Sequence, residues 1–305
     1  MLFHGYYRLN ESPPVVSTWD DAALRHLARQ PRQEPLYCLV HLPWDHAVAH
    51  RMLRKKLLFA WLRYRGLRPL LVTNSPAEDA YRRRLGIPGF RGISYVYTDE
   101  KAYSAEPGVV KQYDAVYAAQ LRPFKRLELA AEVERLFVLT YTPGRPENDL
   151  PAFCPALRQA AYNRTWVDGA GKNRIYNQSR VGLCLSAVEG PMLASLEYQL
   201  AGLPVVSTPS KGGRDTYYHP ESCLVVAPDA RAVSAGVREM AGRHLDPLTI
   251  RQRTLARLAA DRRTYVNHLA ACVHQADGTW PDPERLYERL FTAPASNFVP
   301  LDAKR

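Results

Sequence analysis

The sequence lacks several features that define whole classes of protein. None of its apolar runs approaches the roughly 18 consecutive residues that a membrane-spanning helix requires, which argues against a spanning protein. Its five cysteines form no CxxC pair, so a disulfide scaffold and a zinc ribbon are both disfavoured. No zinc finger, RNP-type aromatic motif or glycine-rich KH loop is present, and we therefore expect no nucleic-acid partner.

Acidic residues are scarce in the first part of the chain. The formal net charge is +11, with 17 Lys and Arg against 10 Asp and Glu in residues 1–113 but 24 against 20 in residues 114–305. Residues 46–77 contain no Asp or Glu, while seven of them are Lys or Arg. Such a stretch attracts phosphate groups on nucleic acid, anionic lipid or a sugar-phosphate polymer. The charge alone does not choose among these partners.

The basic stretch also carries apolar residues at helical spacing. A helix is expected over 47–65, in which Met52, Leu53, Leu57, Trp61 and Tyr64 belong to an apolar face and the basic residues fill the other face. The basic helix is either an ordinary solvated surface or, with residues 47–68 as a whole, a docking surface for an anionic membrane. Residues 1–8 show no secretory signal pattern, so we expect the protein in the cytoplasm or peripherally on the inner face of the cytoplasmic membrane.

Strand and helix patterns alternate along most of the chain. They predict an α/β fold of two Rossmann-like domains facing a cleft, with a reduced amino-terminal domain. Residues 1–34, which contain Ser12-Pro13-Pro14, are interpreted as an arm or cap. Strands are expected at 37–41, 70–73, 93–97, 115–118, 136–140, 181–186, 203–207 and 223–226, and further helices at 76–84, 127–135, 191–201, 230–241, 247–273 and 283–291. The expected domains are 1–113 and 114–282, followed by a carboxyl-terminal helix and tail, 283–305.

Two glutamates stand on either side of an expected helix start. Glu189 follows a strand, and Glu197 comes eight residues later on the helix, a rise of about 12 Å. That rise is comparable to the span from the sugar ring to the ribose in a nucleotide-sugar. One carboxylate can hold sugar hydroxyls and the other ribose hydroxyls, while the free N–H groups of the helix start suit a diphosphate.

The ordered combination of motifs resembles the carboxyl-terminal donor domain of retaining GT-B glycosyltransferases, in particular glycosyltransferase family 4. The family pattern is Glu-Gly, a second Glu after seven intervening residues, Gly-x-Pro-Val-Val and Gly-Gly, which corresponds here to 189–190, Glu197, 202–206 and Gly212-Gly213. The segment 120–126, Gln-Leu-Arg-Pro-Phe-Lys-Arg, is similar to the family's Arg/Lys diphosphate grip. The resemblance covers roughly residues 114–242, and the front half lacks the family's glycine-rich loop.

The resemblance implies transfer of a hexose from a nucleoside diphosphate sugar, with retention at the anomeric carbon and with neither metal nor cofactor. Lys125 stands where the family lysine is expected, whereas the usual arginine is replaced by Gln120. The role of the family arginine is transferred to Arg122, with Arg126 as the alternative. These cations would stabilise the leaving diphosphate.

Other positions receive roles through the same resemblance. Glu189 would orient the sugar and Glu197 the ribose. Pro191 lacks an N–H but suits a first helical turn, so the backbone of Met192 and Leu193 would contact the anion. Gly190, Gly212 and Gly213 complete the donor contacts, and the two glycines 212–213 equally fit a plain backbone turn. His41, which ends the first expected strand, would face the anomeric centre, with His46 and His50 as competitors.

The acceptor would be a glycan or a lipid-linked glycan in surface polysaccharide synthesis, and an anionic one would suit the basic front half. A nucleotide-sugar epimerase or hydrolase of the same fold is one alternative, although it needs acid and base groups around the sugar. A non-catalytic donor-binding protein, or a basic nucleic-acid-binding protein, is the other.

Overall fold

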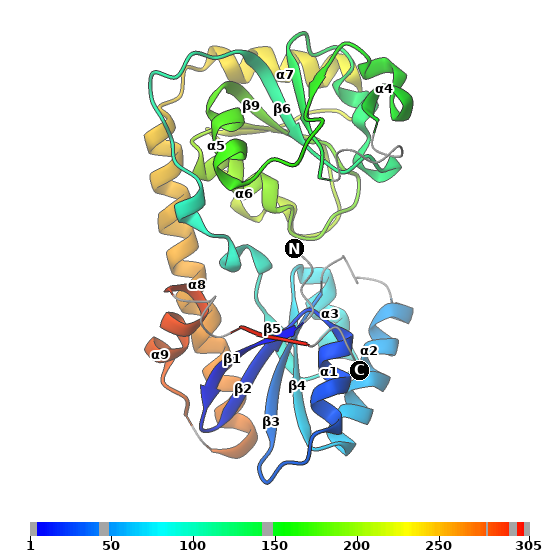
Figure 1. Ribbon diagram of the computed structural model, residues 1–305, viewed down its shortest axis with the longest axis vertical. Coiled ribbons are helices and arrows are strands. Elements are labelled where there is room, and N and C mark those ends of the chain that lie inside the picture. Colours follow the sequence, from blue (N-terminus) through cyan, green and yellow to red (C-terminus); the bar gives the residue numbers. More distant parts are fainter. Residues whose placement is uncertain (1–4, 43–48, 142–148, 279, 293–297, 302–305) are drawn as a thin grey trace. The chain divides into compact units, whose positions relative to one another are not determined.

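The computed structural model describes residues 5–42, 49–141, 149–278, 280–292 and 298–301. The chain divides into two compact units, Met1–Tyr97 with Leu258–Arg305, and Thr98–Arg257. Each unit contains one six-stranded, mainly parallel β-sheet flanked by helices (Figure 1). The prediction of an α/β fold with two Rossmann-like domains is confirmed.

The first sheet has the strand order β12-β1-β2-β3-β4-β5. Its strands are β1 (Gly5–Glu11), β2 (Pro14–Thr18), β3 (Leu36–His41), β4 (Leu67–Thr73), β5 (Gly89–Arg91) and β12 (Phe298–Pro300). Side chains of β3 alternate between two cores, as a strand buried on both faces requires. Cys38 and Val40 pack with helices α1 (Asp21–Arg29) and α2 (Ala49–Tyr64), while Tyr37 and Leu39 pack with residues of α8 (Pro247–Asp277).

The interpretation of residues 1–34 as an arm or cap is wrong. Strands β1 and β2 form a hairpin inside the first sheet, and β2 pairs in parallel with β3. The prolines that suggested an irregular arm lie at the turn of this hairpin, where the Asn10 amide donates to the carbonyls of Ser12 and Pro13, both at 3.0 Å. Proline is tolerated at such a turn because a turn needs fewer backbone donors than a strand interior.

The strand expected at 93–97 is also wrong. Ser94–Tyr97 is a short 3-10 helix, and the strand that pairs with β4 at this edge of the sheet is β5, at Gly89–Arg91. Gly89 has a φ of +140° and lies so close to β4 that an added Cβ would be 2.0 Å from the carbonyl oxygen of Leu71. Only glycine fits this position. Helix α3, by contrast, spans Pro76–Arg84 as predicted.

Helix α2 departs from its predicted two-faced pattern. Met52 is buried with Phe59 and Leu62, but Leu53, Leu57, Trp61 and Tyr64 are exposed. Apolar residues therefore occupy two opposite faces of this helix, and only one of these faces belongs to the core.

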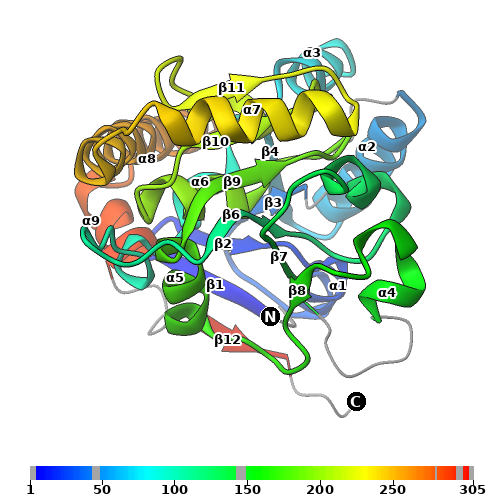
Figure 2. The same ribbon diagram turned by 90° about the horizontal axis from the view of Figure 1, so that it is seen from above.

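The second sheet has the order β11-β10-β9-β6-β7-β8, and all its strands are parallel. The strands are β6 (Tyr113–Ala118), β7 (Leu136–Leu139), β8 (Ala161–Tyr162), β9 (Ser179–Cys184), β10 (Val205–Ser207) and β11 (Cys223–Val225). The helices of this unit include α4 (Leu150–Phe153), α5 (Gly169–Asn177), α6 (Leu193–Leu200) and α7 (Ala230–Gly242), and α7 lies beside β10 and β11 (Figure 2). Residues 127–130, expected to start a helix, form a 3-10 turn.

The division of the chain differs from the one expected from sequence. The first boundary lies at Tyr97/Thr98 rather than at 113/114, and the second falls within α8. The residues expected as a tail return to the first unit, where β12 pairs antiparallel with β1 and α9 (Pro283–Tyr287) contributes Leu286 to the core. Among the residues that the structure describes, no helix is long and apolar enough to cross a membrane.

The burial of the amino-terminal hairpin can be tested by stability. Leu9 is fully buried in the core that contains Tyr37 and Leu39. Leu9→Ala should lower the free energy of unfolding by about 2–5 kcal/mol, because it leaves a cavity. The neighbouring Arg8 is exposed, and Arg8→Ala should change the free energy by about 0.5 kcal/mol or less. Urea unfolding followed by circular dichroism measures both, and equal effects would mean that the hairpin does not belong to the core.

Candidate functional site

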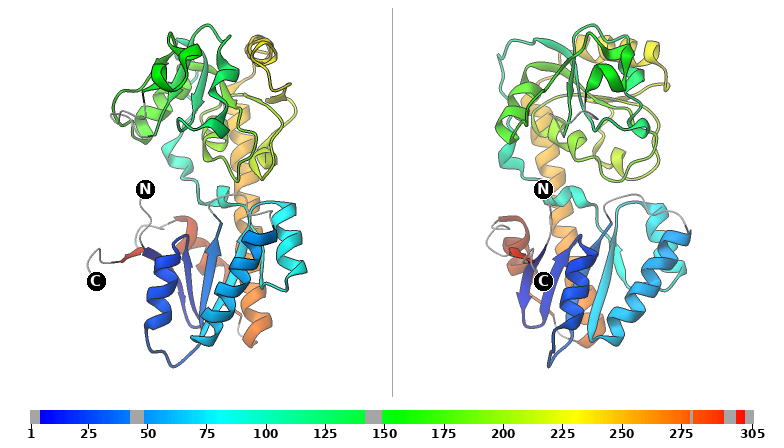
Figure 3. Two further views of the ribbon diagram at one scale, coloured as in Figure 1. Left: turned by 90° about the vertical axis from the view of Figure 1, so that its right-hand side faces the viewer. Right: turned by 45° about the vertical axis from the view of Figure 1, so that its right-hand side comes forward.

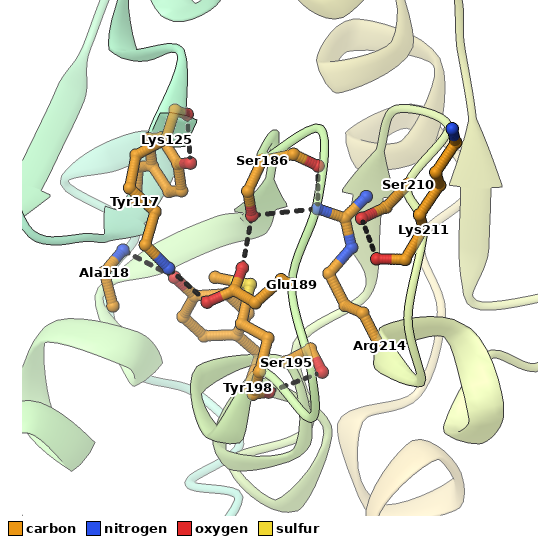
Figure 4. A network of polar contacts seen from close by, with 11 residues as sticks. Tyr117, Ala118, Lys125, Ser186, Glu189, Ser195, Tyr198, Ser210, Lys211 and Arg214 are labelled. Carbon is orange, nitrogen blue, oxygen red and sulfur yellow. Dashed lines mark hydrogen bonds and ion pairs between the residues drawn. The ribbon is translucent and has the colours of Figure 1, made fainter. Parts of the chain in front are cut away.

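A lysine and a glutamate meet where two neighbouring strands of the second sheet end. Glu189 lies in the loop between β9 and α6, and Lys125 lies in a short turn after β6. Their side chains form an ion pair, and the second oxygen of Glu189 accepts a hydrogen bond from Ser186 (Figure 4). The side chains are 7% and 13% exposed. The structure thus brings together two of the predicted site residues.

The turn after β6 is shaped by backbone contacts. The Tyr117 hydroxyl, at 2.5 Å, donates to the carbonyl of Lys125, which anchors the turn to its own strand. Arg126 adopts a left-handed conformation, with φ at 52°, which is uncommon for a residue with a side chain. Its guanidinium donates to the carbonyl of Leu185 at 2.6 Å and to the hydroxyl of Thr208 at 2.7 Å. Arg126 therefore ties the ends of β6, β9 and β10 together.

A fully buried arginine, Arg214, contacts the ion pair through Ser186, and its role was not predicted from the sequence. Arg214 is 1% exposed and donates to the carbonyl of Ser186 at 2.7 Å and to its hydroxyl at 3.1 Å. It also donates to the Ser207 hydroxyl at 3.0 Å and to the carbonyl of Thr208. Ser186 in turn donates to Glu189, so Arg214 orients the carboxylate through the serine. The adjacent Gly-Gly turn was the only sequence signal for it.

Gly212 has a structural role in the same arrangement. Its φ is +117°, and an added Cβ would lie 1.6 Å from the carbonyl oxygen of Glu189. The backbone of Glu189 donates to the carbonyl of Lys211 at 2.9 Å, and Lys211 donates to the carbonyl of Ala187 at 3.0 Å. The turn therefore packs directly against the glutamate backbone, with Gly213 buried beside it.

Glu197 belongs to a second polar cluster on α6. Its carboxylate accepts hydrogen bonds from the Lys172 ammonium at 3.1 and 3.3 Å and from the Tyr176 hydroxyl at 2.7 Å. Lys172 also donates to the hydroxyl of Tyr103 at 3.3 Å, and the pKa of Tyr103 is raised by burial and by the charge of Glu197. Helix α5, which carries Lys172 and Tyr176, was not predicted; its signal is Asp168, whose side chain caps it by accepting from the Gly171 amide at 2.8 Å.

The charges of both glutamates raise the pKa of one tyrosine, Tyr141, which was not predicted as a site residue. The pKa of Tyr141, which follows β7, is raised by burial and then by the charges of Glu197 and Glu189. Between them in the chain, α6 begins after Met192, with Leu193 exposed and Gly190 and Met192 buried. The first N–H groups of a helix have no partner within the helix itself, so this end is suited to an anion.

Arg122, His41 and His50 take no part in the side-chain hydrogen bonds described above. Arg122 is exposed on the same turn as Lys125. His41 is 1% exposed in the first unit, stacked on Trp19 and 2.9 Å from the Ser17 hydroxyl, and burial lowers its pKa to about 3. Such an imidazole is neutral and enclosed, so the structure gives no support to the catalytic role predicted for it. His50 is exposed on α2, and His46 lies outside the described residues.

Chemically, the site offers a cation beside a carboxylate, a helix start and a second oriented carboxylate. This set suits a ligand that carries both phosphate and hydroxyl groups. In the part of the chain that the structure describes, no three His, Cys, Asp or Glu side chains are grouped so that they could hold a metal ion.

Solved glycosyltransferase structures have a similar fold. Sucrose-phosphate synthase from Thermosynechococcus elongatus aligns with a TM-score of 0.56 and 18% identity over 77% of this chain and 65% of that chain. HepE from Anabaena, solved with UDP and glucose, aligns with a TM-score of 0.53 and 15% identity over 80% and 77%. A glycosyltransferase from Rickettsia africae aligns with 0.52 and 13% over 81% and 80%.

These likenesses establish the fold: the chain has the two-domain α/β architecture known as GT-B. The chain spans less than two thirds of the sucrose-phosphate synthase chain, at 65%. No protein-family profile and no curated protein sequence matches it.

The close packing of Gly212 against Glu189 predicts a large effect of a small substitution. Gly212→Ala should lower the free energy of unfolding by at least about 2 kcal/mol, because the methyl group collides with backbone and the positive φ is strained. Gly242→Ala is the matched control, since nothing lies within 4 Å of its added Cβ, and it should change the free energy by about 0.5 kcal/mol or less. Urea unfolding of both variants would refute the packing role if Gly212→Ala were as mild as the control.

Proposed function

We propose that this protein is a glycosyltransferase that uses a nucleoside diphosphate sugar as donor. The single observation that carries the proposal is the Lys125–Glu189 ion pair beside the start of α6. It supplies a positive charge for a diphosphate and a carboxylate for sugar hydroxyls within one contact. The GT-B fold, shared with a protein solved with UDP and glucose, supports the same reading.

The positive charge would act on the leaving group. When the bond between the sugar and the diphosphate breaks, negative charge grows on the bridging phosphate oxygen, and preorganised cations and N–H groups stabilise it. We propose that Lys125 and the N–H groups at the start of α6 do this, and Arg122 is exposed on the same turn as Lys125. Lys125 would exchange part of its contact with Glu189 for the phosphate, which leaves carboxylate oxygens of Glu189 to accept from the sugar.

Glu197 would bind the ribose. Lys172 and Tyr176 fix its carboxylate from one side, and an ionised carboxylate still has lone pairs to accept bonds from further hydroxyls. In this role Lys172 and Tyr176 are positioning residues. They hold the carboxylate in one orientation before the donor arrives.

The finer parts of the proposal rest on the resemblance to glycosyltransferase family 4. We propose that the sugar is a hexose, that it is transferred with retention at the anomeric carbon and that the acceptor is a glycan or a lipid-linked glycan in surface polysaccharide synthesis. The cations would carry the charge of the leaving diphosphate, so the reaction as proposed uses no metal.

One observation favours a second candidate function. His41, the side chain predicted to face the anomeric centre, is 1% exposed and stacked on Trp19. A protein that binds the donor without transferring the sugar is therefore the alternative. Incubation of the protein with donor and acceptor, with release of nucleoside diphosphate as readout, distinguishes the two.

The donor site predicts a selective thermal shift. One of UDP, GDP, ADP and CDP should raise the melting temperature by several degrees at saturating concentration, because a ligand at about 100 times its Kd stabilises the folded state by about 2.7 kcal/mol. Lys125→Gln with Glu189→Gln, which removes both charges and keeps the packing, should abolish the shift. The exposed Lys101→Gln with Glu288→Gln is the control and should keep it. No shift with any of the four nucleotides would contradict the proposal.

The two glutamates should affect binding in different ways. Glu189→Gln should raise the Kd of the nucleotide-sugar at least about tenfold while leaving the Kd of the free nucleoside diphosphate within about threefold, because only the sugar contacts Glu189. Glu197→Gln should raise both Kd values by a similar factor, because both ligands carry the ribose. Isothermal titration calorimetry measures the four values. Equal losses for both ligands in Glu189→Gln would place the sugar elsewhere.

A further inference from the structure

Helix α2 exposes a row of large apolar side chains to solvent. Leu53 is 49% exposed, Leu57 65%, Trp61 41% and Tyr64 86%. These four residues, called here the apolar stripe, recur at intervals of four, four and three, so they lie along one line of the helix surface about 16 Å long. The opposite face of the helix packs on the sheet, with Met52, Phe59 and Leu62 buried in the core. Figure 3 shows α2 running along the outer surface of the first unit.

Cations border the apolar stripe on both sides. By the 3.6-residue period, Lys56 and Arg63 lie along one side, and Arg54 lies along the other. Arg65 follows the end of the helix, and its guanidinium donates to the carbonyl of Ala28 at 3.0 Å. The basic residues at positions 54, 56, 63, 65 and 68 are all exposed. Lys55 is largely covered and pairs with Asp21 at 3.2 Å. No acidic residue occurs between positions 46 and 77.

We propose that the apolar stripe and its bordering cations dock the protein on the surface of an anionic lipid bilayer, with α2 lying in the plane of the interface. The stripe would enter the boundary between headgroups and acyl chains, and the cations would contact lipid phosphates. The tryptophan and tyrosine belong to the residue types that are enriched at this depth. This inference goes beyond the proposed transfer reaction, because it concerns a different unit of the chain from the donor site.

Other occupants fit this surface less well. A nucleic acid would satisfy the cations but leave Leu53 and Leu57 without an apolar partner. A second copy docked stripe against stripe would bring cations from both copies together, and residues 46–77 offer no acidic side chain to pair with them. A lipid surface supplies phosphate and hydrocarbon side by side, as the stripe and its borders require.

Vesicle flotation of the full chain tests the proposal. The protein should float with phosphatidylcholine vesicles that contain about 30% phosphatidylglycerol, and it should float far less with phosphatidylcholine alone. Leu57→Ser with Trp61→Ser should lower the partition coefficient at least about tenfold at low salt. Lys56→Gln with Arg63→Gln should remove most of the preference for anionic vesicles and most of the release by added salt.

The matched control removes two exposed apolar side chains elsewhere. Val110 is 78% exposed and Trp166 65%, and Val110→Ser with Trp166→Ser should leave flotation unchanged. Thermal melts of all variants confirm folding, since every changed position is exposed. Wild-type protein that stays with the aqueous fraction, or a stripe variant that floats like the control, would overturn the proposal. So would a dimer that Leu57→Ser with Trp61→Ser turns into a monomer, since a second copy would then be the occupant.

Discussion

A nearly buried ion pair constrains the whole carboxyl edge of the second sheet. Removing a lysine and a glutamate from water costs several kcal/mol for each ion, and the pair is tolerable only when its geometry is good and its remaining hydrogen-bonding capacity is met. Here Lys125 comes from the turn after β6 and Glu189 from the loop after β9, so the two strand ends must stay adjacent. Ser186 meets the second oxygen of Glu189, and Arg214 in turn holds Ser186.

The same polar network explains why this edge can be ready for a ligand before the ligand arrives. The guanidinium of Arg214 donates hydrogen bonds to Ser186, Ser207 and Thr208. These bonds join the ends of β9 and β10. Preorganised groups of this kind need no rearrangement when negative charge develops on a reacting group. They therefore stabilise that charge effectively. Gly212 contributes by its lack of a side chain, because only then can the turn after β10 lie against the backbone of Glu189.

The sequence was a good guide where local pattern and tertiary role agree. Helix α3 has its predicted bounds because Ser75 caps it, Pro76 begins it and Gly86 follows its end. The order of motifs also placed Lys125 and Glu189 at one sheet edge, where they meet. The sequence pattern gave a wrong or incomplete prediction where one sequence feature is compatible with two structures. The prolines before residue 15 mark a hairpin turn as readily as an arm, and Lys172 of α5 shows its importance only through its distance to Glu197.

Helix α2 shows the same ambiguity in its clearest form. Its apolar residues recur at helical spacing on two faces, and periodicity alone does not say which face a sheet will cover. In the structure, Met52 and Leu62 are buried in the core, whereas Leu57 and Trp61 are exposed. A single exposed apolar residue is ordinary on a protein surface, but a continuous row bordered by cations on both sides is not. The core does not account for that row, so its explanation must lie in what the outer face of α2 contacts.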